Sequence, residues 1–188
     1  MKKLFFTFVL LLVTITMGAQ EHLLFKGIPI DGSVKDFCEQ LKAKGFTYVG
    51  GENNNMLFKG DFTGQNVHVR VASADSGENV FSVMVIFDAI GEWKTLVNTY
   101  DYYKNLYTRK YGKPTFSIEN KPSSSDSNHD LMYELYKGTV LWGSLWKVTG
   151  GSIELSIEKM DYLEGVVVIR YYDDQNMKAK VQNDLEEI

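Results

Sequence analysis

EWKTLVNTYDYYKNLYTRKY, residues 92–111, is the longest strongly periodic stretch of the chain after its N-terminal leader. Its bulky residues recur at spacings of three and four, which places them on one stripe of an α-helix. Arg109 and Lys110 complement the negative end of the helix dipole, and Pro114 prevents the helix from continuing. We expect this stripe to pack on a β-sheet, although its aromatic rings could instead form a binding surface for a ligand. The stripe comprises Trp93, Leu96, Val97, Tyr100, Tyr103 and Tyr107.

The chain opens with MKKLFFTFVLLLVTITMGAQ, a pattern typical of a secretory signal peptide. Two lysines, an apolar run and a small-residue end predict a signal peptide over residues 1–19, with cleavage before Gln20. The apolar run, residues 4–17, is shorter than the roughly 20 residues that span a bilayer. We therefore expect an exported protein of the periplasm or extracellular space, without stable membrane insertion after cleavage. An uncleaved membrane anchor is the alternative.

Composition and charge narrow the class of protein. The formal net charge is −4, and it becomes more negative when a leader with two lysines and no acid is removed. A mildly acidic chain with mixed charges argues against nucleic acid and against anionic membrane surfaces as partners. The only cysteine, Cys38, precludes an internal disulfide and is expected to be an inert, buried thiol. Residues 20–188 suffice for a single α+β domain, or for two closely packed halves, 20–119 and 120–188.

The rest of the chain alternates between helical and strand patterns. A helix capped by Ser33 and ended by Gly45 precedes four strand-like segments, and the central helix follows them. After a polar loop over residues 121–128, a short segment around 131–136 fits either a helix or a strand. Three further strands lead to a terminal helix that we expect Asn176 to cap. The expected strands cover residues 46–49, 56–59, 67–71, 80–87, 115–119, 140–148, 152–158 and 166–172.

This order of elements predicts an α+β fold, in which helices pack on one face of an antiparallel β-sheet. A helix, a group of strands and a second helix follow one another twice along the chain, so we expect a tandem helix–strands–helix arrangement joined in one sheet. In the strand at 152–158, the alternation of residues places Ser152, Glu154, Ser156 and Glu158 toward water.

Five segments of the chain form a recognisable pattern: FKGIPIDGS at residues 25–33, LKAKGF at 41–46, LFKGDFTG at 57–64, KYGKP at 110–114 and IRYYD at 169–173. In these segments the chain resembles a family of uncharacterised exported proteins of anaerobic gut bacteria. The resemblance is scattered over most of the chain after the leader, and it implies no activity and no catalytic residue. The order of elements is also similar to the fold of β-lactamase-inhibitor proteins, a non-catalytic scaffold, and a likeness of fold does not determine function.

The sequence lacks the familiar catalytic and metal-binding motifs. His22, His68 and His129 stand in no zinc-binding spacing, and there is no P-loop, no dinucleotide-binding glycine pattern and no nucleophile elbow. Asp173 and Asp174 could bind Ca²⁺, but they are explained more simply as residues that favour the start of the terminal helix. We therefore predict no metal site and no cofactor.

Trp142 and Trp146 are the binding-site candidates that the sequence offers. On a strand they share one face while Leu141 and Leu145 occupy the other, so both faces carry bulky apolar side chains. One face must meet the helices, and an uncovered face would present an aromatic surface to a partner protein, peptide or glycan. Burial of both faces is the alternative.

The sequence thus favours an exported, non-enzymatic binding module with an unknown protein, peptide or glycan as its ligand. The leader, the missing catalytic motifs and the surplus of aromatic residues motivate this hypothesis. The alternative is a hydrolase that acts on an envelope or dietary polymer through a pair of carboxylates, whose spatial separation the sequence does not reveal.

Overall fold

The computed structural model describes residues 21–52, 54–74, 77–122 and 126–188. The expected signal peptide, residues 1–19, lies outside these residues. In the described part of the chain, no helix has both the length and the apolar character needed to cross a bilayer. The helices are α1 (Val34–Ala43), α2 (Trp93–Tyr111), α3 (Asn128–Lys137) and α4 (Asp174–Glu186).

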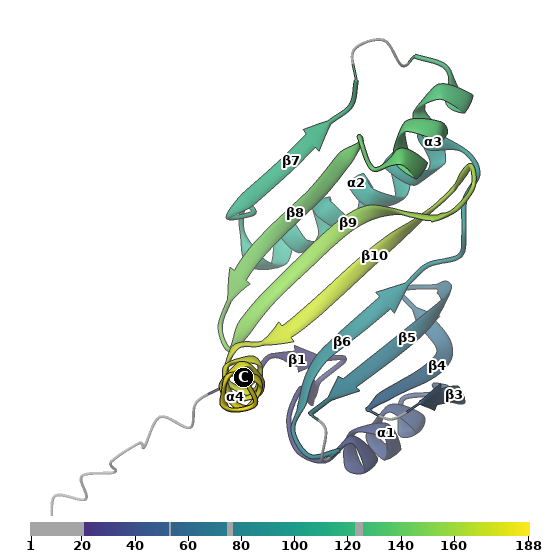
Figure 1. The fold of residues 1–188 in the computed structure, drawn as a ribbon. Helices are drawn as coiled ribbons and strands as arrows, with labels where there is room; N and C mark the ends of the chain where they lie inside the picture. Colours follow the sequence, from purple (N-terminus) through teal and green to yellow (C-terminus); the bar gives the residue numbers. More distant parts are fainter. Residues whose placement is uncertain (1–20, 53, 75–76, 123–125) are drawn as a thin grey trace, which may run out of the picture.

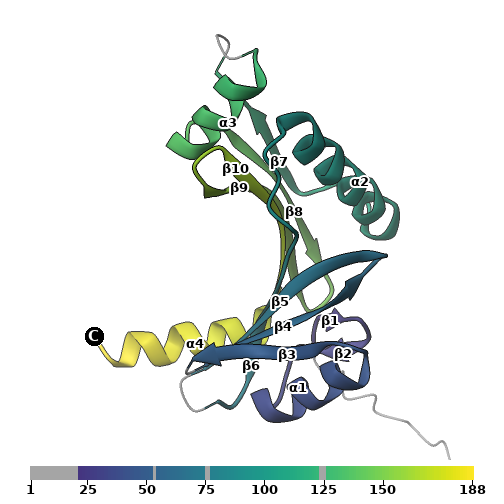
Figure 2. The same ribbon diagram turned by 90° about the vertical axis from the view of Figure 1, so that its right-hand side faces the viewer.

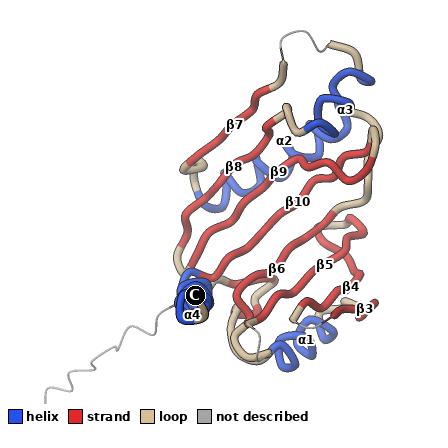
Figure 3. Tube along the Cα trace, viewed as in Figure 1, coloured by secondary structure: helices blue, strands red, loops and turns tan. Residues whose placement is uncertain are grey.

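An eight-stranded antiparallel sheet forms the centre of the molecule, in the order β3-β4-β5-β6-β10-β9-β8-β7 (Figures 1 and 3). β6 and β10 pair in its middle, so strands from both ends of the chain join in one sheet. A two-stranded hairpin, β1-β2, is separate from it. The predicted α+β class, with helices packed on an antiparallel sheet, is confirmed. The strands are β1 (Leu24–Phe25), β2 (Ile28–Pro29), β3 (Thr47–Glu52), β4 (Asn55–Phe62), β5 (Gln65–Ser73), β6 (Val80–Ile86), β7 (Phe116–Asn120), β8 (Leu141–Val148), β9 (Gly151–Asp161) and β10 (Glu164–Asp173).

The sheet has a covered face and an open face. On the covered face, a row of paired side chains crosses the centre of the sheet, and every member is fully buried. α2 packs here against β8, β9 and β10, while α1 packs against β5 in the other half (Figure 2). α3 packs against α2 and against β9 and β10. The central row of the covered face comprises Val69, Val85, Ile169 and Leu155.

The aromatic stripe of α2 fills the space above the covered face, as its spacing predicted. Trp93, Leu96, Tyr100, Tyr103 and Tyr107 are all buried. The buried hydroxyls also find partners, which makes burial of the tyrosine rings favourable. The hydroxyl of Tyr100 lies 2.6 Å from Oγ of a serine on β8, and that of Tyr103 lies 2.6 Å from Oγ1 of a threonine after β4.

The structure settles one local alternative and corrects two local expectations. Residues 131–136 belong to helix α3, which settles the choice between helix and strand. The segment before Ser33 contains the β1-β2 hairpin, which the sequence analysis did not predict. Asp173, and not Asn176, is the N-cap of α4, because its carboxylate accepts from the backbone N–H groups of Gln175 and Asn176.

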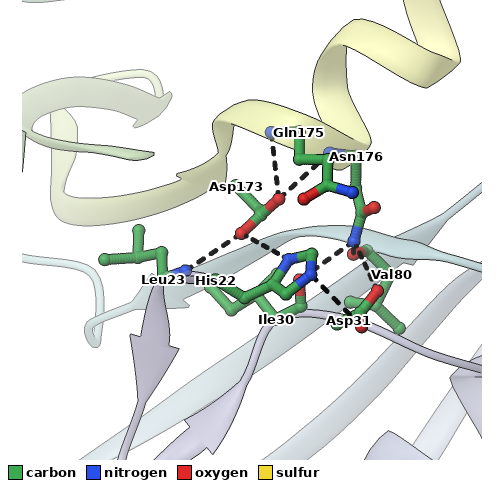
Figure 4. A network of polar contacts seen from close by, with 8 residues as sticks. All are labelled: His22, Leu23, Ile30, Asp31, Val80, Asp173, Gln175 and Asn176. Atoms are coloured by element: carbon green, nitrogen blue, oxygen red, sulfur yellow. Dashed lines mark hydrogen bonds and ion pairs between the residues drawn. The ribbon is translucent and has the colours of Figure 1, made fainter. Parts of the chain in front are cut away.

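A buried polar junction connects the start of α4 to the N-terminal segment (Figure 4). The carboxylate of Asp173, which is fully buried, also accepts from the backbone N–H of Leu23 at 2.9 Å. Nδ1 of His22 lies 3.0 Å from the same oxygen. A buried carboxylate is tolerated only when it is paired and hydrogen-bonded, so these contacts hold β10, α4 and the segment before β1 in one arrangement.

Asn176 forms the second part of this junction (Figure 4). Its Nδ2 group lies within hydrogen-bond distance of the carbonyl oxygens of Ile30 and Val80, at 3.1 and 3.0 Å, and of Oδ1 of Asp31, at 3.0 Å. One side chain thus bridges the end of the hairpin segment and the first residue of β6. The residue that we expected to cap α4 instead anchors the helix to two remote parts of the chain.

We expect Asn176→Ala to lower the free energy of unfolding by about 2–4 kcal/mol, because buried carbonyl groups lose their donor. Asn183→Ala, on the exposed part of the same helix, is the matched control and should change stability little. Urea denaturation of both variants measures the difference. Equal midpoints for the two variants would show that the junction does not stabilise the fold.

Candidate functional site

Trp142 and Trp146 lie on the covered side of β8, beneath α2. Trp146 is 1% exposed, and its Nε1–H donates to the carbonyl of Gly112 at the end of α2, at 3.0 Å. Trp142 is partly buried, and its ring meets that of Trp93 edge to face at 5.2 Å. These indoles therefore do not form the exposed aromatic surface considered from the sequence, because their face of the strand meets the helices. A role for them in ligand binding stays a prediction.

The opposite face of the sheet has none of the described helices lying across it (Figure 2). Paired side chains form a continuous row over this face from β4 to β7, which we term the open-face row. It combines charged and large apolar side chains; most of them are half-buried, and Phe116 is 58% exposed. The row comprises Leu57, Arg70, Met84, Arg170, Glu154, Leu145 and Phe116.

The sheet is strongly curved, and the open face is its concave side (Figure 2). α4 starts at the end of β10 and extends outward on this side, so it borders the concave face without covering it (Figures 1 and 2). Val166 and Val168 point to this side of β10, yet each is only 3% exposed. Neighbouring side chains of the same face therefore enclose them. The concave face is a partly closed surface with an apolar floor.

Arg170 holds a cluster of polar side chains at the centre of the open-face row. Its Nη2 donates to Oε2 of Glu158 at 2.8 Å, and its Nη1 contacts the other oxygen of the same carboxylate. Nη1 also donates to Oγ of Ser156 at 3.2 Å and lies 3.9 Å from Oε1 of Glu154. A bidentate pair of this kind fixes the orientation of the guanidinium. The cluster thus presents a fixed pattern of charge within an apolar surface.

The environment of this cluster keeps its main pair ionised. Burial acts to raise the pKa of Glu158, but hydrogen bonds from Arg170 and Ser156 and the charge of Arg170 outweigh it, so the pKa is lowered. The hydrogen bond to Glu158 raises the pKa of Arg170. Ser156 and Ser152 point to the open face as predicted, but they are only 8% and 7% exposed. The expectation that these two serines face water was wrong. The hydroxyl of Ser156 joins the ion pair, because it donates to Glu158 and accepts from Arg170.

The carboxylates of this cluster do not favour the hydrolase alternative. Acid catalysis by a carboxyl group requires a raised pKa, so that the group keeps its proton near neutral pH. The pKa of Glu158 is shifted the other way, and Glu154 contacts the same arginine. The hydrolase alternative stays a prediction.

His22 lies between two carboxylates (Figure 4). Its Nδ1 is 3.0 Å from Oδ2 of Asp173, and its Nε2 is 3.4 Å from Oδ2 of Asp31. A histidine that activates a serine needs one ring nitrogen free to accept the proton, and here both nitrogens face carboxylates. Among the residues that the structure describes, no group of three or more His, Cys, Asp or Glu side chains could hold a metal ion. The role of Asp173 is to cap α4.

Cys38 packs partly buried against the core from α1. Burial raises the pKa of its thiol to about 11, so the thiol keeps its proton near neutral pH. The nucleophilic thiolate is therefore scarce. This agrees with the expectation of an inert cysteine.

Arg170 and its neighbours were not predicted as a site from the sequence. Assembling the open-face row requires the register of every strand pair, and residue patterns along single strands do not contain it. One signal was present: Arg170 is the only charged residue within the apolar run Val166–Tyr172 of β10. A lone charge in a central strand needs a partner, and the outward-facing glutamates of the preceding strand were the nearest candidates.

Comparison of the chain with protein-family models, with curated proteins and with solved structures found no match. The resemblances to exported gut-bacterial proteins and to β-lactamase-inhibitor proteins therefore stay predictions. The function has to be argued from the surfaces of the molecule.

We expect Glu158→Gln to flatten the acid dependence of stability. The pKa of Glu158 is lower in the folded protein than the value of about 4.3 for an unfolded glutamate. Its ion pair therefore stabilises the fold above that pH, and this contribution is lost as the pH falls through the folded-state pKa. Urea midpoints measured from about pH 6 to pH 3 should fall more steeply for the wild type than for the variant. Glu187→Gln, at the exposed end of the chain, is the control. If the urea midpoints of all three proteins depend on pH in the same way, the lowered pKa assigned to Glu158 is contradicted.

Proposed function

We propose that the protein is an exported, non-enzymatic binding module that holds a partner protein or peptide on the concave face of its sheet. The observation that carries this proposal is the open-face row, which no described helix crosses. A sheet face that meets only water normally carries polar residues. Here Leu57, Met84 and Leu145 stay accessible on it. An accessible apolar surface with a polar border is the usual mark of an interaction site.

The residue types of the open-face row favour a protein over a glycan as the ligand. Aromatic residues, Met and Arg are enriched in protein–protein interfaces, whereas Lys is depleted. The row contains Arg70, Met84, Arg170 and Phe116, and it contains no lysine. Arg170 is already held by a carboxylate, so binding would cost little side-chain entropy there. Together these features fit a preformed docking surface.

The signal-peptide pattern supports a location outside the cytoplasm for this module. The partner would then be another exported or cell-surface protein. Export also suits a chain with a single cysteine of raised pKa, which offers little thiolate for oxidation or disulfide exchange.

A photo-crosslinking amino acid at Met84 tests the proposal in cells that produce the full chain. Met84 lies in the middle of the open-face row, whereas Asn105 is exposed on α2 and serves as the control position. We expect a discrete crosslinked partner from Met84 and none from Asn105. The partner, identified by mass spectrometry and purified, should bind Met84→Glu at least about tenfold more weakly, equivalent to 1.4 kcal/mol.

Met84→Leu keeps an apolar side chain of similar volume and should bind the partner nearly as well as the wild type. Equal affinity of the wild type and Met84→Glu for the partner would overturn the proposal. Equal crosslinking at Met84 and Asn105 would do the same, because it would indicate non-specific contact.

A further inference from the structure

A cleft lies on the opposite side of the molecule from the open-face row, between the β1-β2 hairpin and the C-terminal end of α2. It has a volume of about 250 Å³. Leu24, Lys26, Lys110 and Tyr111 line both this cleft and an adjacent hollow of about 680 Å³, so the two adjoin. We term it the tyrosine cleft, after the residues Tyr103, Tyr107, Tyr111 and Tyr171 that line it.

The wall of the tyrosine cleft is aromatic. The rings of Tyr107 and Tyr111 stack at 6.0 Å with an interplanar angle of 19°. Phe62 and Leu106 add apolar surface beside them. Flat rings and a leucine form a surface that suits the apolar body of a small molecule.

The tyrosine cleft also contains a phenol proton without an acceptor. The hydroxyls of Tyr107 and Tyr171 share one hydrogen bond, and burial raises the pKa of both groups, so both stay protonated. Each hydroxyl carries one proton, and only one of the two protons lies in their shared bond. No acceptor for the second proton is found among the described residues. The two side chains are more than nine-tenths buried, and both residues line the cleft, so a ligand in the cleft can accept the second proton.

Two ammonium groups, those of Lys26 and Lys110, bring positive charge to the tyrosine cleft in a chain whose net charge is −4. Nζ of Lys26 donates to the backbone carbonyl of Asp61 at 3.1 Å and lies 5.2 Å from the centroid of the Phe46 ring. Nζ of Lys110 lies over the ring of Tyr111, 4.8 Å from its centroid. No acidic residue is among the described residues that line the cleft itself, but the charge of Asp61 acts to raise the pKa of Tyr103, and Glu21 lines the adjoining hollow. A ligand with negative charge would therefore be attracted.

We propose that the tyrosine cleft binds a small organic carboxylate. Its apolar body packs against the rings, and its carboxylate lies near the ammonium groups of Lys26 and Lys110. One carboxylate oxygen accepts the unused proton of the pair formed by Tyr107 and Tyr171. Each polar group of the cleft then has a partner, and the assignment does not depend on the partner proposed for the open face.

Other ligand classes fit the tyrosine cleft less well. A cationic ligand would be repelled by both lysines, and a neutral one would gain nothing from their charge. A single carboxylate on an apolar body matches both the charge and the aromatic surface.

Titration calorimetry with the purified chain lacking its leader tests the proposal. The probes are phenylpropionate and octanoate, each compared with the alcohol and the amine that carry the same apolar body. We expect at least one carboxylate to bind about tenfold more tightly than its alcohol, and the amines to bind more weakly still. Lys110→Met keeps an apolar stem without the charge and should weaken carboxylate binding about tenfold.

Lys94→Met makes the same change of charge at the other end of α2 and should leave carboxylate binding unchanged. Tyr107→Phe keeps the ring but removes the hydroxyl, and it should weaken carboxylate binding. A thermal unfolding transition of this variant checks that it is folded. Met84→Glu, on the open face, should have no effect, which separates this site from the proposed docking surface. The proposal is overturned if neither carboxylate binds, if the head groups bind alike, or if Lys110→Met binds as the wild type does.

Discussion

The antiparallel pairing of β6 with β10 is the contact on which the rest of the structure depends. It joins four strands on one side to four on the other and places Ile169 opposite Val85 and Arg170 opposite Met84. Because side chains alternate between the two faces, a shift of one residue in the register of β10 would move each of its side chains to the opposite face. Arg170 would then lie beneath α2, and Tyr171 would lie on the open face. Consecutive residues of one strand thus build two different surfaces, and both require the same register.

A layer of aromatic side chains stabilises this arrangement in a chain that cannot form an internal disulfide. Each tyrosine ring buries a large apolar area, and its hydroxyl needs a partner. Tyr100 bonds to Ser144 and Tyr103 to Thr63, so both rings can lie in the core. Trp142 is the exception, because its buried Nε1–H has no partner among the described residues. The dense packing of this layer must outweigh that cost.

The predictable parts of the fold are those that depend on neighbours in sequence. The spacing within residues 92–111 predicted both α2 and its buried face, because helical periodicity is a local property. The role of Asn176 was not predictable, since its partners Ile30 and Val80 lie 146 and 96 residues away. The alternation in β8 showed two apolar faces, but only the placement of α2 decided that the tryptophans lie on the covered one. The open-face row depends on strand pairing in the same way.

The two faces of the sheet differ in what covers them, and their side chains differ accordingly. On the covered face, the central row consists of Val69, Val85, Ile169 and Leu155, which are all fully buried. On the open face, the same four strands carry Arg70, Met84, Arg170 and Glu154, and the charged members of this set can keep their polar ends in water or in ion pairs. The bulge next to Ala72 adds local twist between β5 and β6. The register of the strands therefore decides both which side chains lie beneath the helices and which remain on the concave side (Figure 2).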